Sequence, residues 1–324
     1  MSTRISEVDF SRLLDVRVDY LFKLIFGNDK PRLISLLNAI FANKRIDRVI
    51  TDLVFISPAL EKQSETDKFS IIDIMATLSN GSTACIEMHL YGLPEFKFKS
   101  LRTWARVYGG ELKAGQKFWE NKPVICISFL DGAITNADDK PLKAVHTLFQ
   151  VRERDGHELL LNDMELHYIN MRAFVEEHHG GDVPPDMFTK WLTLITQSKQ
   201  SDKEFLKDIC REDEVIAMAV GILASLTEDE ATRLAYSRRQ DEITNYYATI
   251  QQLEDSLRRA EESDRRAAEE RRRAEESDRR AEESDRRAEE SDRRAVRAMR
   301  ARNWTVADIA EALERPEEEI EKFL

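Results

Sequence analysis

The spacing of apolar residues predicts alternating helices and strands in the first half of the chain. Residues 18–42 carry apolar side chains at helical spacing, and Gly27 and Pro31 divide them into two short helices. Residues 46–56 contain many β-branched side chains and predict a strand. The segment 124–130, VICISFL, is almost entirely apolar, which is typical of a central buried strand. This pattern indicates a mixed α/β domain.

Two further strands, at 69–78 and 82–90, flank the dipeptide Asn80-Gly81, which is a strong signal for a β-hairpin. Residues 145–170 predict two more strands, around HTLFQVRER and MELHYINM. A helix is expected at 95–115, with an apolar stripe along one side. The stripe consists of Phe98, Leu101, Trp104, Tyr108 and Leu112.

The apolar residues of the hairpin decide how its strands pair. A two-residue loop would place Ile74 opposite Glu87, whereas a three-residue loop with left-handed Gly81 pairs Leu78 with Ser82. Because a shift of one residue exchanges the two faces of a strand, burial favours the three-residue loop, which gathers the apolar residues on one face. The apolar pairs are then Ile72 with Met88, Ile74 with Ile86, and Ala76 with Ala84.

The other face of the hairpin would bring two carboxylates together. Asp73 falls directly opposite Glu87, with His89 and Met75 beside them. Carboxylates about 5 Å apart repel each other, and a divalent cation such as Mg²⁺ between them would remove this repulsion. Such a metal can activate water and neutralise charge on a phosphodiester. Alternatively, the strand ends are exposed and both carboxylates are solvated.

The second half of the chain is helical, with helices expected at 185–197, 202–224 and 228–259. Five seven-residue units then run from Ala260 to Arg294, four reading AEESDRR and one AAEERRR. Each AEESDRR unit places Glu four residues before Arg twice, and the AAEERRR unit does so once, an arrangement that stabilises a helix surface. We interpret these units as a solvated charged helix that acts as a spacer. A coiled coil through the recurring Ala and Ser positions is the alternative.

The C-terminal residues 303–324 predict two short helices. Thr305 is the expected N-cap of the first, with Asp308 three residues later, and Pro316 opens the second. The four glutamates between Glu317 and Glu321 would face DNA phosphates unfavourably. We therefore expect a small docking or packing element, and a helix-turn-helix DNA reader is the less favoured alternative.

The charge balance argues against a protein that simply coats nucleic acid. The 324 residues carry a net charge of −12, and both parts of the chain are acidic. Residues 251–324 contain 23 acidic and 18 basic side chains, and residues 1–250 contain 38 and 31. An apolar fraction of 42% is compatible with a substantial core.

The cysteines and the remaining apolar segments indicate a cytoplasmic protein. Cys85, Cys126 and Cys210 show no paired spacing, which predicts small buried side chains instead of a disulfide framework or a zinc site. The N-terminus has no apolar segment typical of a signal peptide, and no stretch of about 18 apolar residues predicts a membrane span.

Basic and histidine side chains supply few further signals. Lys99, Arg102, Arg106 and Lys113 recur on one side of the helix at 95–115. They form either an edge that contacts phosphates or the ordinary solvated side of an amphipathic helix. Five histidines lack ligand spacing with one another or with the hairpin and are interpreted as surface or strand residues. They are His146, His157, His167, His178 and His179.

Three segments in this order carry a resemblance to a known family. They are VDYLFKLIFGND, IIDIMATLSNGSTACIEMH and FKFKSLRTWARVYGGELKAGQKFWENKPVICISFLD. Together they resemble the PD-(D/E)XK nuclease family transposases, also called recombination-promoting nucleases. The resemblance covers residues 12–135 well and extends more loosely to the ending WTVADIAEAL. It implies a restriction-endonuclease-like α/β core, with a mixed central sheet flanked by helices.

The resemblance also implies roles for individual residues. Asp73 and Glu87 match the family's metal-binding acidic positions on the second and third strands, and Asp19 matches an acidic position near the site. His89 occupies a position where the family carries Lys or, in this branch, usually Gln. The implied metal is Mg²⁺ or Mn²⁺, and the implied substrate is DNA. The residues expected to contact DNA are Lys23, Lys99, Arg102 and Arg106.

Two hypotheses follow from these residues. In the first, the protein is a Mg²⁺-dependent DNA endonuclease, with Asp73, Glu87, His89 and Asp19 in its catalytic site. In the second, it is a catalytically weakened nuclease-fold protein that acts as a binding or assembly scaffold, with homo-oligomers formed through the helical C-terminal part. The expected divisions are a nuclease-like domain, a helical region, a charged helix and a two-helix element. They span 8–180, 181–255, 256–300 and 301–324.

Overall fold

The computed structural model describes residues 5–57, 59–60, 70–90, 96–110, 112, 115–178, 186–196 and 200–323. The chain divides into two compact units, Met1–Ile243 and Thr244–Leu324, which are described separately. Parts of several predicted elements, at residues 69, 95, 111, 113–114, 185 and 197, lie outside the described residues, as does His179. Among the described residues, no helix combines the length and apolar content needed to cross a membrane.

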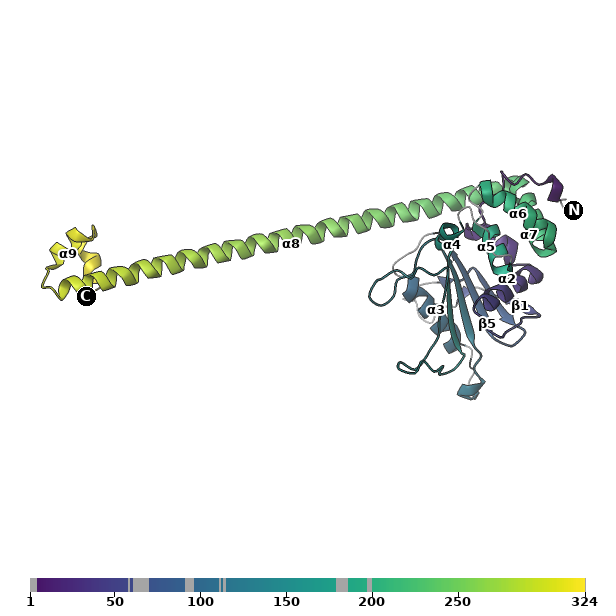
Figure 1. Cartoon of the computed structure of the whole chain (residues 1–324), viewed down its shortest axis with the longest axis horizontal. Helices are drawn as coiled ribbons and strands as arrows, with labels where there is room; N and C mark the ends of the chain where they lie inside the picture. Colours follow the sequence, from purple (N-terminus) through teal and green to yellow (C-terminus); the bar gives the residue numbers. More distant parts are fainter. Residues whose placement is uncertain are drawn as a thin grey trace. The chain divides into compact units, whose positions relative to one another are not determined.

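The first unit is built on a mixed six-stranded sheet with the order β1-β4-β5-β6-β8-β7 (Figure 1). The β5–β6 and β6–β8 pairs are parallel, and the other three pairs are antiparallel. The strands are β1 (Leu53–Ile56), β4 (Ile74–Leu78), β5 (Thr83–His89), β6 (Val124–Leu130), β7 (His146–Phe149) and β8 (Met164–Asn170). A separate antiparallel pair joins β2 (Ala59–Leu60) to β3 (Ser70–Ile71). The predicted α/β fold and its buried central strand β6 are confirmed.

Helices cover both faces of this sheet (Figure 1). The larger core lies between one face and helices that include α1, α2, α5, α6 and α7, whereas α3 packs on the opposite face over a smaller core. Seven described helices precede the long helix α8 (Glu230–Arg300). They are α1 (Asp19–Phe26), α2 (Lys30–Asn43), α3 (Phe96–Gly110), α4 (Met171–Glu177), α5 (Met187–Thr196), α6 (Gln200–Glu212) and α7 (Glu214–Glu228). Two short 3-10 helices are η1 (Ile5–Glu7) and η2 (Phe118–Glu120). Gly27 separates α1 from α2 as predicted, and Pro31 lies in the first turn of α2, where its missing N–H is tolerated.

The hairpin has the predicted register. Ile74 pairs with Ile86 and Ala76 with Ala84, and the Leu78 amide donates to the Ser82 carbonyl at 2.8 Å. Gly81 has a φ of 85°, the left-handed conformation that the three-residue loop requires.

On the N-terminal side of Ile74, at Ile72 and Asp73, the predicted register is wrong. β4 begins at Ile74, and Ile72 is buried on the α3 side of the sheet with Met75 and Cys85 instead of lying beside Ile74. The chain bends at Asp73. The bend allows both Ile72 and Ile74 to be buried, each on a different face.

Helix α3 is also rotated relative to the prediction. Its buried residues are Phe96, Ser100, Thr103 and Val107, with Trp104 and Tyr108 packed at the side. Phe98 is 65% exposed, and Leu101 is exposed as well. The small side chains of Ser100 and Thr103 let the helix lie close to the sheet, where the Ser100 hydroxyl hydrogen bonds with the Tyr168 hydroxyl. Close packing of small polar residues therefore outweighed burial of the larger apolar stripe.

The segment predicted as one helix at 202–224 forms two helices, since the Asp213 side chain accepts from Val215 and Ile216 amides and caps α7. The helix expected at 228–259 continues through the heptad units as α8 (Glu230–Arg300). Pairs of Glu and Arg four residues apart lie along its exposed surface. They are Glu269–Arg273, Glu276–Arg280, Glu283–Arg287 and Glu289–Arg293.

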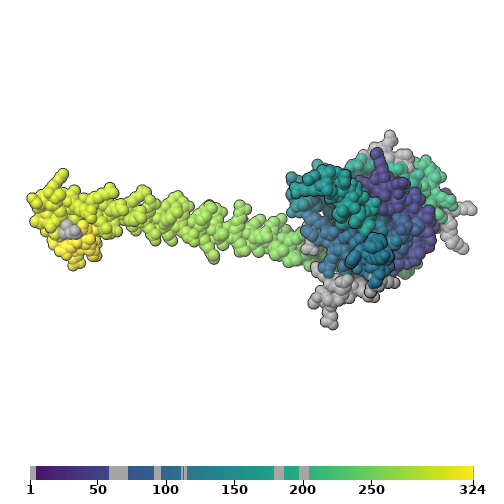
Figure 2. All heavy atoms as spheres, turned by 90° about the horizontal axis from the view of Figure 1, so that it is seen from below, coloured from purple at the N-terminus to yellow at the C-terminus, as the bar shows by residue number. Residues whose placement is uncertain are grey.

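The C-terminal helices α9 (Val306–Ala312) and α10 (Glu317–Glu321) gather at the last turns of α8 (Figure 2). Val296, Ile309 and Ile320 form their small core. The predicted capping box is present, because the Asp308 amide donates to Thr305 Oγ1 at 3.2 Å and the Thr305 amide donates to Asp308 Oδ2 at 2.9 Å. The two short helices were thus predicted correctly.

Candidate functional site

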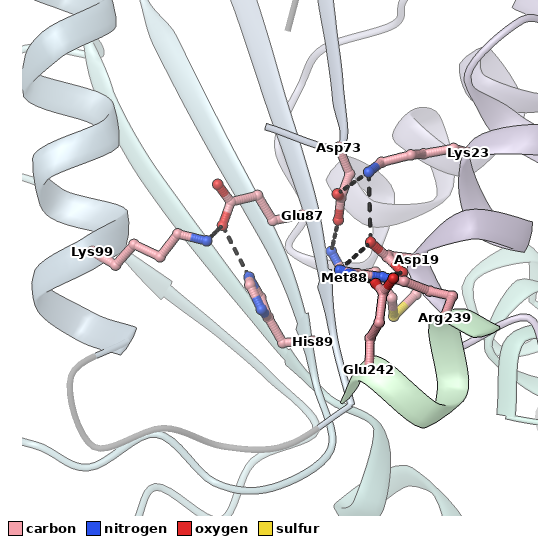
Figure 3. A network of polar contacts seen from close by, with 9 residues as sticks. All are labelled: Asp19, Lys23, Asp73, Glu87, Met88, His89, Lys99, Arg239 and Glu242. Atoms are coloured by element: carbon pink, nitrogen blue, oxygen red, sulfur yellow. Dashed lines mark hydrogen bonds and ion pairs between the residues drawn. The ribbon is translucent and has the colours of Figure 1, made fainter. Parts of the chain in front are cut away.

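Asp73 lies at the bend just before β4, where its carboxylate replaces a missing strand contact. Had the predicted register continued, the Met88 amide of β5 would have faced Ile72. Instead this amide donates to Asp73 Oδ2 at 2.8 Å (Figure 3). The carboxylate is therefore fixed against the edge of the hairpin by a backbone hydrogen bond.

Two helices from distant parts of the chain complete the surroundings of Asp73. Lys23 of α1 places its Nζ 2.8 Å from Asp73 Oδ1 and 3.6 Å from Asp19 Oδ2. Arg239 of α8 donates two hydrogen bonds to the Asp19 carboxylate, from Nε at 2.8 Å and from Nη2 at 2.9 Å. Arg239 also donates to Glu242 at 2.9 Å. We call Asp19, Lys23, Asp73 and Arg239 the aspartate cluster (Figure 3).

The two aspartates of this cluster differ in their electrostatics. Burial raises the pKa of Asp73, and the nearby Lys23 ammonium offsets only part of that rise. Burial also opposes ionisation of Asp19. There, however, the hydrogen bonds and charge of Arg239 outweigh burial and hold the pKa of Asp19 below its usual value. Asp19 is thus a firmly ionised carboxylate, whereas Asp73 depends on a neighbouring cation.

Glu87 of β5 belongs to a second group on the α3 side of the sheet. Its Oε2 lies 2.9 Å from His89 Nε2 and 2.9 Å from Lys99 Nζ (Figure 3). The His89 ring packs edge-on against Phe96, with the ring centroids 4.3 Å apart. Burial opposes ionisation of Glu87, but His89 and Lys99 together lower its pKa below the usual value. We call Glu87, His89 and Lys99 the glutamate cluster.

One oxygen of the glutamate cluster has no partner. Glu87 is only 5% exposed, and its Oε1 is a buried atom without a hydrogen bond. Buried carboxylate oxygens are almost always satisfied, so such an atom marks a place where a donor or a cation would be stabilised.

The predicted arrangement of Asp73 directly opposite Glu87 on one face is wrong in this structure. Asp73 turns toward α1, whereas Glu87 and His89 turn toward α3 (Figure 3). Among the described residues, no hydrogen bond or ion pair links the two carboxylates, and no group of three or more His, Cys, Asp or Glu side chains is arranged to hold a metal ion. The bend at Asp73 is the physical reason, since it reverses the direction of the side chain.

The predicted DNA-contacting residues are divided between these groups. Lys23 and Lys99 each neutralise a carboxylate of the site. Arg102 is exposed and Arg106 half-buried, one and two turns further along α3 from Lys99. Lys113 lies outside the described residues.

Sequence reasoning missed Arg239, because nothing in its local sequence distinguishes it from other arginines of a charged helix. It also missed a buried pair of histidines. His146 Nε2 lies 3.0 Å from His167 Nδ1, and His167 Nε2 lies 3.2 Å from Glu165, which Arg48 grips at 2.7 and 2.9 Å. These residues join β7, β8 and the loop after α2, and they do not contact either carboxylate cluster.

The cysteines are buried as predicted, but two of them come together. Cys85 and Cys126 pair across the parallel strands β5 and β6, and both are free thiols. Burial and the hydrogen bond with Cys85 raise the pKa of Cys126, with the Cys85 contact as the larger cause. A protonated, buried thiol is a poor nucleophile and metal ligand, so this pair serves as packing.

Comparison with known proteins identifies the family. A family model described as PD-(D/E)XK nuclease family transposase matches residues 16–253, which include both clusters. No protein of curated function and no solved structure is detectably similar to the chain. Since the match spans well over half of its residues, the chain belongs to the PD-(D/E)XK nuclease family transposases.

Proposed function

We propose that the protein is a Mg²⁺- or Mn²⁺-dependent endonuclease that hydrolyses phosphodiester bonds of DNA. The observation that carries this proposal is the unpartnered, buried Oε1 of Glu87. The next residue of β5, Met88, donates its amide to Asp73 of the aspartate cluster, where Arg239 holds Asp19 ionised. Nuclease-type function follows from the family, and nucleases of this family typically use divalent metal ions.

The residues present fit a divalent cation in part. Glu87 Oε1 supplies a buried carboxylate oxygen, the kind of ligand that hard cations prefer. Asp73 is a carboxyl whose ionisation depends on a nearby positive charge. We assign Asp73 and Glu87 as the residues that would hold the metal, an assignment that requires the Asp73 carboxylate to turn from Lys23 toward Glu87. A bound Mg²⁺ would supply Lewis acidity toward a phosphate oxygen and lower the pKa of a bound water.

The remaining residues of the two clusters position the Lys23 ammonium and the His89 ring. Arg239 fixes Asp19, and Asp19 together with Asp73 fixes the Lys23 ammonium, so this cation is available to a DNA phosphate at a defined place. His89 is held through Nε2 by Glu87 and by ring contact with Phe96. We assign His89 to positioning the attacking water or accepting its proton, the task of the Lys or Gln found elsewhere in the family.

A second candidate function rests on the same contacts. Lys23 and Lys99 already neutralise Asp73 and Glu87, and His89 replaces the usual residue. A nuclease fold whose carboxylates are each already paired with a lysine does not need a metal to balance their charge, and it would serve as a binding or assembly scaffold. The scaffold function and the endonuclease function therefore predict opposite results in one assay.

The assay measures nicking of supercoiled plasmid DNA with Mg²⁺ or Mn²⁺. We expect nicking by the wild-type protein, and its loss in Asp73→Asn and in Glu87→Gln. Asp52→Asn is the matched control, because Asp52 is an exposed aspartate that is also paired with a lysine, Lys30. Intact plasmid with both the wild-type protein and a His89→Gln variant would refute the endonuclease.

Calorimetric titration separates the two functions without DNA. We expect Mg²⁺ or Mn²⁺ to bind the wild-type protein and the Asp52→Asn control, but to bind Asp73→Asn far more weakly. The scaffold function instead requires that no metal binding depends on Asp73.

A further inference from the structure

Two aromatic side chains project into solvent from the turn that precedes β6. Phe118 is 88% exposed and Trp119 is 78% exposed, more than the other large apolar side chains that the structure describes. Isolated apolar side chains are common on protein surfaces, but two consecutive aromatic residues with this exposure are candidates for contact with a binding partner.

The turn that carries these rings is held in place by its backbone. The Glu120 amide donates to the Lys117 carbonyl at 2.9 Å, and the Lys117 amide donates to the Glu120 side chain at 3.4 Å. Asn121 donates through Nδ2 to the carbonyl of Tyr108 in the last turns of α3, at 3.1 Å. The rings are therefore presented from a turn that is tied to α3. We call residues 117–122 the aromatic turn.

The segment that contains the aromatic turn is rich in basic residues. The Lys117 ammonium lies 5.0 Å from the centre of the Trp119 ring, and Lys122 ends the turn. Residues 96–122 contain seven basic and two acidic side chains, although the whole chain has a net charge of −12. This segment is thus a basic region in an acidic protein, and it is complementary to a polyanion.

The basic region also connects the aromatic turn to the candidate site. Lys99, at the start of α3, contacts Glu87 of the glutamate cluster. Arg102 and Arg106 follow along the same side of α3, and the Tyr108 carbonyl then meets Asn121 of the aromatic turn. Helix α3 therefore contacts the carboxylate through Lys99 and the aromatic turn through the Tyr108 carbonyl.

We propose that the aromatic turn binds unpaired bases of single-stranded DNA. Phe118 and Trp119 stack on successive bases, while Lys117 and Lys122 contact the neighbouring phosphates. Aromatic rings alternating with cations are the usual means of binding single strands without sequence preference. This inference rests on the proposed function, and it narrows the substrate to DNA that is frayed, gapped or single-stranded beside the cutting site. An anionic membrane surface would attract the same charges, but the connection to Glu87 favours the nucleic acid.

The test is binding of fluorescent oligonucleotides, measured by anisotropy in EDTA so that cleavage does not occur. The probes are a single strand of about 12 nucleotides, close to the usual length of such sites, and a blunt duplex of the same length. Combined Phe118→Ala and Trp119→Ala substitutions should weaken single-strand binding at least about fivefold, the effect of losing one weakly stacked base. Duplex binding should change by less than about twofold, because a blunt duplex offers few unpaired bases for stacking.

Two control variants and one further test variant complete the experiment. Trp119→Phe keeps a ring and should retain most of the single-strand affinity. Tyr246→Ala removes an exposed ring outside the basic region and should change nothing. Lys117→Ala should reduce the dependence of log affinity on log salt concentration by about 0.7 for each lost phosphate contact, whereas the two aromatic substitutions should leave this dependence unchanged.

The outcomes separate this inference from the endonuclease. Unchanged single-strand affinity in the double variant overturns the inference, even if plasmid nicking with Mg²⁺ proceeds normally. Binding of the wild-type protein, but not of the double variant, to phosphatidylglycerol vesicles without any effect on single strands also overturns it, in favour of a membrane surface. A wild-type protein that nicks no plasmid but loses single-strand binding in the double variant would refute only the endonuclease.

Discussion

The ammonium group of Lys23 lies 2.8 Å from the carboxylate of Asp73, and the two side chains point toward one another from α1 and from the bend before β4 (Figure 3). The same ammonium lies 3.6 Å from Asp19. Lys23 thus serves as an internal counter-cation where sequence reasoning expected a metal. Because burial raises the pKa of Asp73, the charge of this carboxylate depends on which cation is beside it.

Replacing Lys23 by Gln should therefore strengthen metal binding. The substitution removes a positive charge that competes with Mg²⁺ for Asp73, so we expect the Kd for Mg²⁺ to fall at least about fivefold, equivalent to about 1 kcal/mol for a partly exposed charge interaction. Without metal, the melting temperature should fall, because Asp19 and Asp73 would lose the cation between them. Calorimetric titration and thermal melting with and without Mg²⁺ measure both effects.

Lys30→Gln is the matched control, since Lys30 also pairs with an aspartate at 2.9 Å, but this pair is exposed and belongs to neither cluster. It should leave the Mg²⁺ affinity unchanged. If Lys23→Gln binds Mg²⁺ no better than wild type, Lys23 does not occupy a metal position.

His89 provides the second prediction. Gln can replace His89 as a hydrogen-bonding partner of Glu87, whereas Ala removes both the partner and the ring that packs on Phe96. We expect His89→Gln to nick plasmid DNA at least as fast as wild type, and His89→Ala to be slower by about 100-fold or more, the usual effect of losing a group that transfers a proton. Initial nicking rates at saturating Mg²⁺ make the comparison. Equal rates for wild type and His89→Ala would show that His89 has no part in the reaction.

The hairpin illustrates what could be predicted from the sequence. Its register between Ile74 and Leu78 follows from a pattern of apolar residues that permits only one buried face. The pattern did not reveal the bend at Asp73, because Ile72 is apolar and can be buried on either side of a sheet that is covered on both faces. Burial therefore determined the register but not the direction of the carboxylate.

Contacts across long sequence separations were beyond prediction for a different reason. Arg239 reaches Asp19 because α8 starts beside α1, and nothing in the local spacing of either segment encodes this placement. The same holds for His146 and His167, which meet only because β7 and β8 pair in one register. Local patterns predict elements, whereas the packing of those elements decides which polar groups meet.

The buried histidines predict how stability depends on pH. Burial, together with the charges of His167 and Lys44, lowers the pKa of His146 to about 2, and burial also lowers the pKa of His167. Below about pH 6.5 these two histidines bind protons in the unfolded chain, whereas in the folded protein they stay neutral to lower pH. The free energy of unfolding should therefore fall by about 1.4 kcal/mol per pH unit through His146 as the pH drops from about 6.5 to 4.5, and His167 should act in the same direction.

Urea denaturation across this pH range measures the effect. His146→Asn should reduce the slope of the free energy of unfolding against pH by about 1.4 kcal/mol per pH unit. The control His157→Asn, at an exposed position, should leave this slope unchanged. A second decrease in the free energy of unfolding should begin only below about pH 4.5. There Glu165, whose hydrogen bonds with His167 and Arg48 outweigh burial and hold its pKa at about 2, becomes protonated in the unfolded chain. A slope that is identical in wild type and His146→Asn would contradict this assignment.

The heptad units provide the last prediction, which concerns assembly. Every residue from Ala260 to Arg287 is exposed, and the ion pairs along α8 join side chains of the same helix four residues apart. Such pairs stabilise an isolated helix by about 0.3–0.5 kcal/mol each and leave little apolar surface for a partner. Deleting residues 260–294 should therefore leave the number of chains per particle unchanged in sedimentation equilibrium. If the deletion lowers that number, the heptad units form a coiled coil and are not a spacer.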